Sequence, residues 1–291
     1  MNAISNEATR PTSPAGDEGA ASFPSTAARR NILVNVLRVL FLVVIVGGWE
    51  LGARTGVIDP FFWGRPSGIW QQLVTWVTQG TAQGPLWVQI VATLEETALG
   101  FVIGVVLGII FGIVLGRNSF LADVLGPYIK ALNAIPRVML GPILIIGLGL
   151  GLQSKVALSV IMVFFIVFFN AFQGVREVDR NLLANARILG ASERRLSTAV
   201  IIPSALSWIL ASLHTSFSFA LVGAVVGEFL GSTEGIGLLV QTAQANFNTN
   251  GVFAAIVILA VVSLLMEAII TALENRLIRW RPNASNEVMG L

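Results

Sequence analysis

Six long apolar segments constrain this chain more than any other feature of its sequence. They cover residues 32–52, 97–116, 131–151, 156–172, 204–227 and 252–272. Most hold about 20 residues, the length that a helix needs to cross the hydrocarbon core of a membrane. A soluble domain carries charge on about 25% of its residues, whereas here the share is 12%. The sequence therefore predicts an all-α, polytopic membrane protein with six transmembrane helices.

The third apolar segment, residues 131–151, is expected to be bent or broken. It contains Pro136 and Pro142. A proline inside a helix removes a backbone hydrogen bond and clashes with the preceding turn. The fourth segment follows after a very short connection at residues 152–155. The end of the third segment and the start of the fourth are therefore the least sharply defined boundaries.

Basic residues are distributed unevenly between the connecting segments. With the N-terminus inside, the inside segments carry 14 Lys and Arg residues and the outside segments carry three. Cytoplasmic loops are enriched in Lys and Arg, so both termini are expected in the cytoplasm. We divide the chain into a disordered tail at 1–30, a first span with an external interfacial helix at 31–90, a transmembrane core at 91–275 and a cytoplasmic tail at 276–291. Ser67 is expected to cap the external helix.

Two spans carry glycine at every fourth residue, which places the glycines on one helical face. A face without side chains lets another helix approach closely. Tight packing within the bundle and a surface along which helices slide are both compatible with this pattern. The helix-packing glycines are Gly100, Gly104, Gly108 and Gly112 in the second span and Gly223 and Gly227 in the fifth.

Polar side chains within the spans are candidates for a translocation pathway. Ionisable residues there cost about 2.5–3.5 kcal/mol each on insertion scales, so they usually face a cavity or a partner. For Arg137 the alternative is an interfacial anchor, for His214 a hydrogen bond between helices, and for Glu228 pairing with a neighbouring helix or capping of a turn. The candidates are Asn133, Arg137, His214, Ser218 and Glu228.

Catalytic chemistry has little support in this sequence. The chain has no cysteine and one histidine, which excludes Cys-ligated and multi-His metal sites. It has no GxxxxGK(S/T) phosphate loop, so we expect no ATP hydrolysis and no cofactor in this chain. The net charge of +2 does not favour nucleic acid as a partner.

Glu95, Glu96 and Glu267 lie near predicted span ends and are expected at the membrane interface.

The longest inside loop, residues 175–202, predicts a helix, a turn and a second helix. Apolar residues recur at helical spacing as far as Leu189. Gly190 is a natural helix stop, where the turn is expected to need positive φ, and Ser192 is a natural cap for the next helix. Pro203 suits the first turn of the fifth span, because its missing N–H would be unpaired there.

This loop resembles the EAA signature of bacterial ABC importer permeases. In that signature the EAA triplet is followed by three residues, a Gly, nine residues and Ile-x-Leu-Pro. Here Ala184-Asn185-Ala186 stands at the triplet, and Gly190 and Pro203 stand at the expected distances. Ala184 replaces the Glu of the signature, so the resemblance does not carry over a salt bridge from that position to an ATPase.

The resemblance extends over about residues 60–282, to the taurine, sulfonate, nitrate and bicarbonate branch of these permeases. GRPSGIWQQL, NAIPRVMLGPILIIGLGLG and VVGEFLGSTEGIGLLV are among the segments that carry it. It implies a MetI-like permease fold in the bacterial inner (plasma) membrane and a pore made by a homodimer. It also implies two ABC ATPase subunits, which use ATP and Mg²⁺, and a periplasmic or lipid-anchored solute-binding protein.

The same resemblance implies which residues couple ATP hydrolysis to transport and what is carried. The ATPase-coupling residues would be Ala184, Asn185, Ala186, Arg187, Leu189, Gly190 and Pro203. The expected solute is a small anion such as a sulfonate, nitrate or an organic carboxylate, with a vitamin or pyrimidine precursor as the alternative. A stand-alone channel or secondary carrier is the alternative function, and it would not need this loop.

Overall fold

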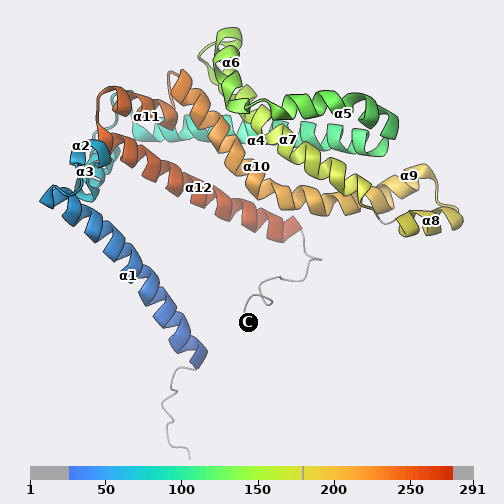
Figure 1. Ribbon diagram of the computed structural model, residues 1–291, viewed down its shortest axis with the longest axis horizontal. Helices are drawn as coiled ribbons and strands as arrows, with labels where there is room; N and C mark the ends of the chain where they lie inside the picture. The colour runs from blue at the N-terminus through green and yellow to red at the C-terminus, as the bar shows by residue number, and fades with distance from the viewer. Residues whose placement is uncertain (1–25, 179, 278–291) are drawn as a thin grey trace, which may run out of the picture. The chain divides into compact units, whose positions relative to one another are not determined.

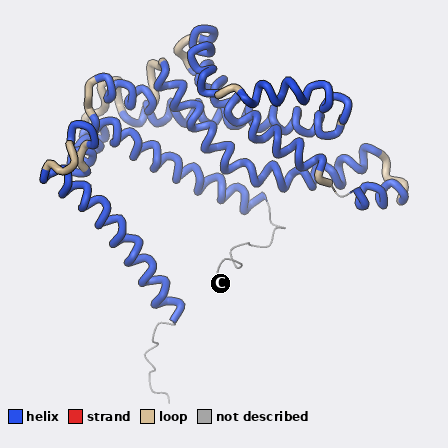
Figure 2. Tube along the Cα trace, viewed as in Figure 1, coloured by secondary structure: helices blue, strands red, loops and turns tan. Residues whose placement is uncertain are grey.

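The computed structural model describes residues 26–178 and 180–277, and its regular elements there are helices (Figure 2). The chain divides into a first unit that ends at Trp49 and a second unit that begins at Glu50. The first unit holds most of helix α1 (Thr26–Thr55), which is long and apolar enough to cross a membrane. Because α1 begins at Thr26, the predicted tail at 1–30 overlaps its start. Residues 1–25 of that tail, and 278–291 of the C-terminal tail, lie outside the described residues.

The second unit is built on four long helices that could each span a membrane: α4 (Leu86–Arg117), α7 (Leu152–Arg176), α10 (Ile202–Leu230) and α12 (Thr249–Leu277). A further pair, α5 (Ser119–Ala134) with η1 (Arg137–Leu140) and α6 (Gly141–Leu148), is bent by 85° at its break. With α1, the described residues contain five spans, or six if the bent pair is one. The predicted all-α fold and the predicted break are both confirmed.

The spans begin earlier than predicted, and the difference is largest for two of them. Helix α4 begins at Leu86 rather than at residue 97, and α5 begins at Ser119 rather than at residue 131. Charged side chains lower the hydropathy of both added stretches, which conceals them in the sequence. Glu96, expected at the membrane interface, is only 5% exposed because it points into the bundle.

Helix α7 packs between α4 and α10 in the centre of the bundle (Figure 1). The glycines of α4 meet five side chains of α7 in register: Ser159, Val163, Val167, Ala171 and Val175. A Cβ added at Gly108 would lie 2.7 Å from the Cβ of Val167, so no larger residue fits without movement. Gly223 and Gly227 of α10 approach α7 in the same way.

Short helices gather at the two ends of the second unit. Helices α2 (Pro60–Trp63), α3 (Pro66–Thr78) and α11 (Ile236–Ala245) lie at one end, near the start of α12 (Figure 1). The Asn250 side chain at the start of α12 accepts a hydrogen bond of 3.0 Å from the N–H of Arg65. Because α3 begins at Pro66, Ser67 is not its cap. Instead the Ser67 N–H donates to the Glu50 carboxylate (3.0 Å).

At the opposite end, α8 (Arg180–Ile188) and α9 (Glu193–Leu196) connect α7 to α10 (Figure 1). Helix α9 continues through a π-helical turn, η2 (Ser197–Ile201), directly into α10. Pro203 lies in the first turn of α10, as predicted. The helical stretch itself begins earlier, because residues Arg194–Leu230 are continuous. A π-turn rearranges the backbone hydrogen bonds next to the missing N–H of the proline.

Candidate functional site

The turn between α8 and α9 has the geometry that its sequence predicts. Gly190 has φ of +80°, a conformation that side-chain-bearing residues rarely adopt. Its N–H donates to the Arg187 carbonyl (2.9 Å), and the Ala191 N–H donates to the Ala186 carbonyl (3.0 Å). This pair of bonds is a Schellman motif, which closes the C-terminal end of a helix. The Ser192 hydroxyl then accepts from the Arg195 N–H and caps α9.

The tip of this turn presents apolar side chains to the surroundings, outside the spans. Ile188 is 82% exposed and Leu189 is 86% exposed. Ala184, Asn185 and Arg187 are also exposed, and Ala186 is half-buried. Beside the tip is a polar hollow of about 320 Å³, lined by Gly190, Ser192, Arg194, Arg195 and Thr198. An apolar tip next to a basic hollow is a surface suited to a protein partner.

Arg137 stands where the chain breaks between α5 and α6. Its guanidinium lies 4.9 Å from the centre of the Phe165 ring of α7, a cation–π contact. It also donates a hydrogen bond to the side-chain oxygen of Asn133. Two of the predicted pathway residues, Asn133 and Arg137, therefore contact each other. The Phe165 ring keeps the Arg137 guanidinium close to α7.

His214 of α10 pairs with Glu267 of α12. The His214 Nδ1 and a Glu267 carboxylate oxygen are 2.7 Å apart. Ser218 lies one turn further along α10 and donates to the His214 carbonyl (3.3 Å). The sequence placed Glu267 at the interface and not beside His214, because nothing in the sequence aligns residues on two different spans.

Glu228 is fully buried near the C-terminal end of α10. Its two carboxylate oxygens accept from the Thr93 hydroxyl of α4 and from the Gly237 N–H of α11, both at 2.6 Å. The Gln89 side chain of α4 accepts from the Gly235 N–H (2.8 Å). These bonds fasten the start of α11 to α4 and α10. They correspond to the alternative role of Glu228, which is pairing with a neighbouring helix or capping of a turn.

Lys155 is another buried residue that sequence reasoning missed. It is one of the three basic residues that the topology prediction assigns to the outside segments, yet its side chain is fully buried at the start of α7. Its ammonium group donates to the carbonyls of Leu150 and Gly151 at the end of the α6–α7 turn. A lysine beside a glycine-rich turn carries no sequence signal that distinguishes a buried position from an exposed one.

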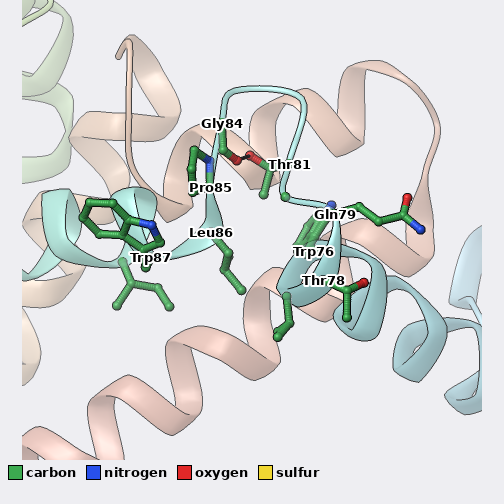
Figure 3. Close-up of a pocket in the computed structure, with 11 residues that line it drawn as sticks. Trp76, Thr78, Gln79, Thr81, Gly84, Pro85, Leu86 and Trp87 are labelled. Carbon is green, nitrogen blue, oxygen red and sulfur yellow. Dashed lines mark hydrogen bonds between the residues drawn. The ribbon is translucent and has the colours of Figure 1, made fainter.

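The five predicted pathway residues do not meet in one place within a single chain. Asn133 bonds to Arg137, which contacts α7. His214 and Ser218 lie on α10, where His214 pairs with α12, and Glu228 is enclosed with α4 and α11. A cavity of about 500 Å³ lies apart from them, between the end of α3 and the start of α4, with Trp76 and Trp87 in its walls (Figure 3). None of its lining residues is charged.

Comparisons with known proteins agree with this architecture. Residues 104–279 match the family described as "Binding-protein-dependent transport system inner membrane component". The chain is 32% identical over 243 residues to the putative aliphatic sulfonates transport permease protein SsuC of Bacillus subtilis, covering 84% of this chain and 87% of that one. It is 34% identical over 243 residues to the riboflavin transport system permease protein RibX of Chloroflexus aurantiacus, covering 82% and 88%.

A solved structure shows the same fold. The chain superimposes on a structure titled "Inward facing conformations of the MetNI methionine ABC transporter" with a TM-score of 0.52 and 18% sequence identity. The match covers 67% of this chain and 96% of that one. At this identity the likeness concerns the fold, and it confirms the predicted MetI-like arrangement of helices.

Proposed function

The chain belongs to the family of binding-protein-dependent transport system inner membrane components, and from this premise we propose that it is the pathway-forming subunit of an ATP-driven importer. In this proposal two copies of the chain enclose the pathway. A separate pair of ATPase subunits hydrolyses ATP with Mg²⁺, and an external binding protein delivers the solute. The chain itself is a non-catalytic permease, and nothing in the comparisons favours a stand-alone channel or carrier.

The observation that carries the proposal is the apolar tip between α8 and α9. Ile188 and Leu189 are almost fully exposed, although they lie outside the spans and so have no lipid to cover them. Exposed apolar patches outside a membrane mark surfaces that bind another protein. We therefore assign the predicted coupling residues at 184–190 to the docking surface for the ATPase.

The helix that follows the tip supports mechanical coupling. Because α9 runs through η2 into α10 without a break, a push on α9 would be transmitted along the whole length of α10. Rigid-body rocking of packed helices is a known means of switching access between two sides of a membrane. Pro203 lies within this continuous helix, so it would influence the shape of the helix and would not contact the ATPase.

The proposed solute is a small anion such as a sulfonate, nitrate or an organic carboxylate. Arg137 supports this, because it places a permanent positive charge at the break of the bent span. The name of the SsuC relative also favours a sulfonate, whereas the name of the RibX relative favours a vitamin. Uptake of labelled sulfonate, nitrate and riboflavin by cells that express the full transporter would decide between these classes.

The proposed location is the bacterial inner membrane with both termini in the cytoplasm. The ratio of 14 inside to three outside basic residues supports this orientation. It places α8 and α9 in the cytoplasm, where an ATPase has access to ATP, and α3 and α11 on the side from which a binding protein would arrive.

A single substitution tests the coupling proposal. Gly190→Val forces a β-branched residue into φ of +80° and should misdirect α9, so that the permease inserts into membranes but no longer co-purifies with its ATPase. Gly56→Val is the matched control, because Gly56 has φ of +79° and equally open space but lies at the end of α1. Normal ATPase yield and normal solute-stimulated hydrolysis in Gly190→Val would contradict the assignment of this loop.

A further inference from the structure

A cavity of about 530 Å³ lies between α5 and the last turns of two spans, α4 and α7. It is distinct from the α8–α9 tip and from the residues proposed for the solute pathway. Three phenylalanines of α7, Phe168, Phe169 and Phe172, form an apolar wall. In α5 only Ala122 is buried, so the helix leaves open space beside α7 instead of packing tightly against it.

Charged side chains complete the lining. Lys130 of α5 and Arg176 of α7 both face the cavity, together with Asp123, which gives the lining a net charge of +1. The Arg176 guanidinium lies 5.0 Å from the centre of the Phe172 ring. Among the described residues, neither Lys130 nor Arg176 forms an ion pair with a carboxylate.

We propose that this cavity binds an anionic phospholipid of the phosphatidylglycerol type. The phosphodiester would lie between Lys130 and Arg176, and the glycerol hydroxyls would donate to Asp123. An acyl chain would follow the phenylalanine wall into the bilayer. Basic pockets between transmembrane helices are suited to lipid headgroups, and a ligand with one net negative charge matches the net charge of this lining.

The position of the cavity distinguishes a lipid from a free anion. Leu115 and Arg176 belong to the last turns of their helices, so the cavity lies where the apolar spans end. A free anion would use the two cations but would leave the aromatic wall wet. A phospholipid covers both parts of the lining at once, because its headgroup is polar and its chains are apolar.

Gly126 offers a way to close the cavity without disturbing the fold. It lines the cavity, and a Cβ added at this position would meet nothing within 4 Å. Gly126→Leu should therefore fill space that the lipid would occupy. Gly147→Leu is a matched control, because a Cβ at Gly147 also meets nothing within 4 Å and Gly147 does not line this cavity.

The test measures lipid retention by the full-length protein. The protein is extracted in mild detergent, stripped of lipid, and mixed with phosphatidylglycerol or phosphatidylethanolamine before native mass spectrometry. We expect one phosphatidylglycerol per chain, preferred over phosphatidylethanolamine at equal concentration. Lys130→Gln and Arg176→Gln should each weaken that binding about fivefold, which corresponds to the roughly 1 kcal/mol that a basic residue contributes near an anionic lipid surface. Gly126→Leu should abolish it.

Arg117→Gln is the charge control, since Arg117 ends α4 but does not line the cavity. Equal binding of the two lipids, or unchanged binding in both charge variants, would overturn the proposal. Displacement of the lipid by millimolar inorganic phosphate would show that the site takes a free anion. Dissociation of a dimer in Gly126→Leu, with lipid binding intact, would show that a second copy of the chain fills the cavity instead.

Discussion

Arg137 shows how a permanent charge is accommodated in a broken span. The chain leaves helical geometry at Ile135 and Pro136, and the guanidinium of Arg137 then rests on the Phe165 ring while bonding to Asn133. Neither contact neutralises the charge, because an aromatic face and an amide oxygen are both uncharged. The residue therefore keeps its capacity to attract an anion.

Replacement of Arg137 tests that role. Arg137→Gln should raise the solute concentration that half-saturates uptake by about tenfold or more, since a hydrogen bond to a charged group is worth about 1.5–3 kcal/mol. Assembly should be unaffected, as judged by the yield of the purified complex. Arg117→Gln, which removes an exposed charge at the end of α4, should transport normally. Unchanged uptake in Arg137→Gln would show that the residue is only an interfacial anchor.

Glu228 represents the opposite case, a charge-bearing side chain whose hydrogen bonds are all internal. Glu228→Ala should lower the melting temperature in detergent, because the Gly237 N–H would lose its acceptor and the Thr93 hydroxyl would keep only the Gln89 carbonyl. Each buried unsatisfied group costs about 1–3 kcal/mol. Glu95→Ala, an exposed neighbour of Glu96 on α4, should leave the melting temperature unchanged. A normal melting temperature in Glu228→Ala would return Glu228 to the list of pathway candidates.

At the scale of the elements, the contact between α4 and α7 is the most extensive in the second unit. Glycines at every fourth position of α4 face side chains at every fourth position of α7, so the two helices approach over several turns. Close approach increases dispersion contact between helices, which matters in a membrane because lipid tails are as apolar as the side chains. A surface fitted this tightly resists sliding, so the structure favours packing over a sliding role for these glycines.

Gly108→Leu tests the tight fit at its centre. The new side chain would overlap Val167 and approach the backbone of α7 at 3.0 Å, so the helices would have to separate. We expect less folded protein in the membrane, measured by the monodisperse peak in size-exclusion chromatography. Gly47→Leu in α1 should express normally, since a Cβ there meets nothing within 4 Å. Equal peaks for the two variants would refute the packing argument.

At the scale of the whole molecule, the second unit has two chemically different ends. Helices α2, α3 and α11 form one end (Figure 1). Polar hydrogen bonds connect this end to the spans, one of them exposed at Arg65 and one buried at Gly235. The other end carries α8 and α9, with their exposed apolar tip and the arginines beside it. These two ends are expected to face opposite sides of the membrane.

Cysteine labelling tests this orientation on a chain that has no native cysteine. Ser67 on α3 and Ser192 between α8 and α9 are both exposed. A cysteine at Ser67 should react with a membrane-impermeant maleimide in intact cells, and one at Ser192 should react only after the cells are lysed. The reverse pattern would contradict both the orientation and the cytoplasmic assignment of the coupling loop.

The sequence alone determined the fold class, the break at Pro136 and the turn at Gly190. These features depend on local physics: the length of an apolar run, the missing N–H of proline and the freedom of glycine at positive φ. The period of four in the glycines likewise indicated close packing, although it did not identify the partner. Each signal lies within one segment of the chain and needs no knowledge of its neighbours.

Only the tertiary structure decided which distant residues meet. It placed Glu267 beside His214, placed Thr93 beside Glu228, and buried Glu96 inside the bundle. It also joined α9 to α10 through a π-turn, so that the second helix of the loop and the fifth span form one continuous stretch. The physical reason is that a polar residue in a span gains stability from whichever partner the packing brings within reach, and packing is a property of several helices together.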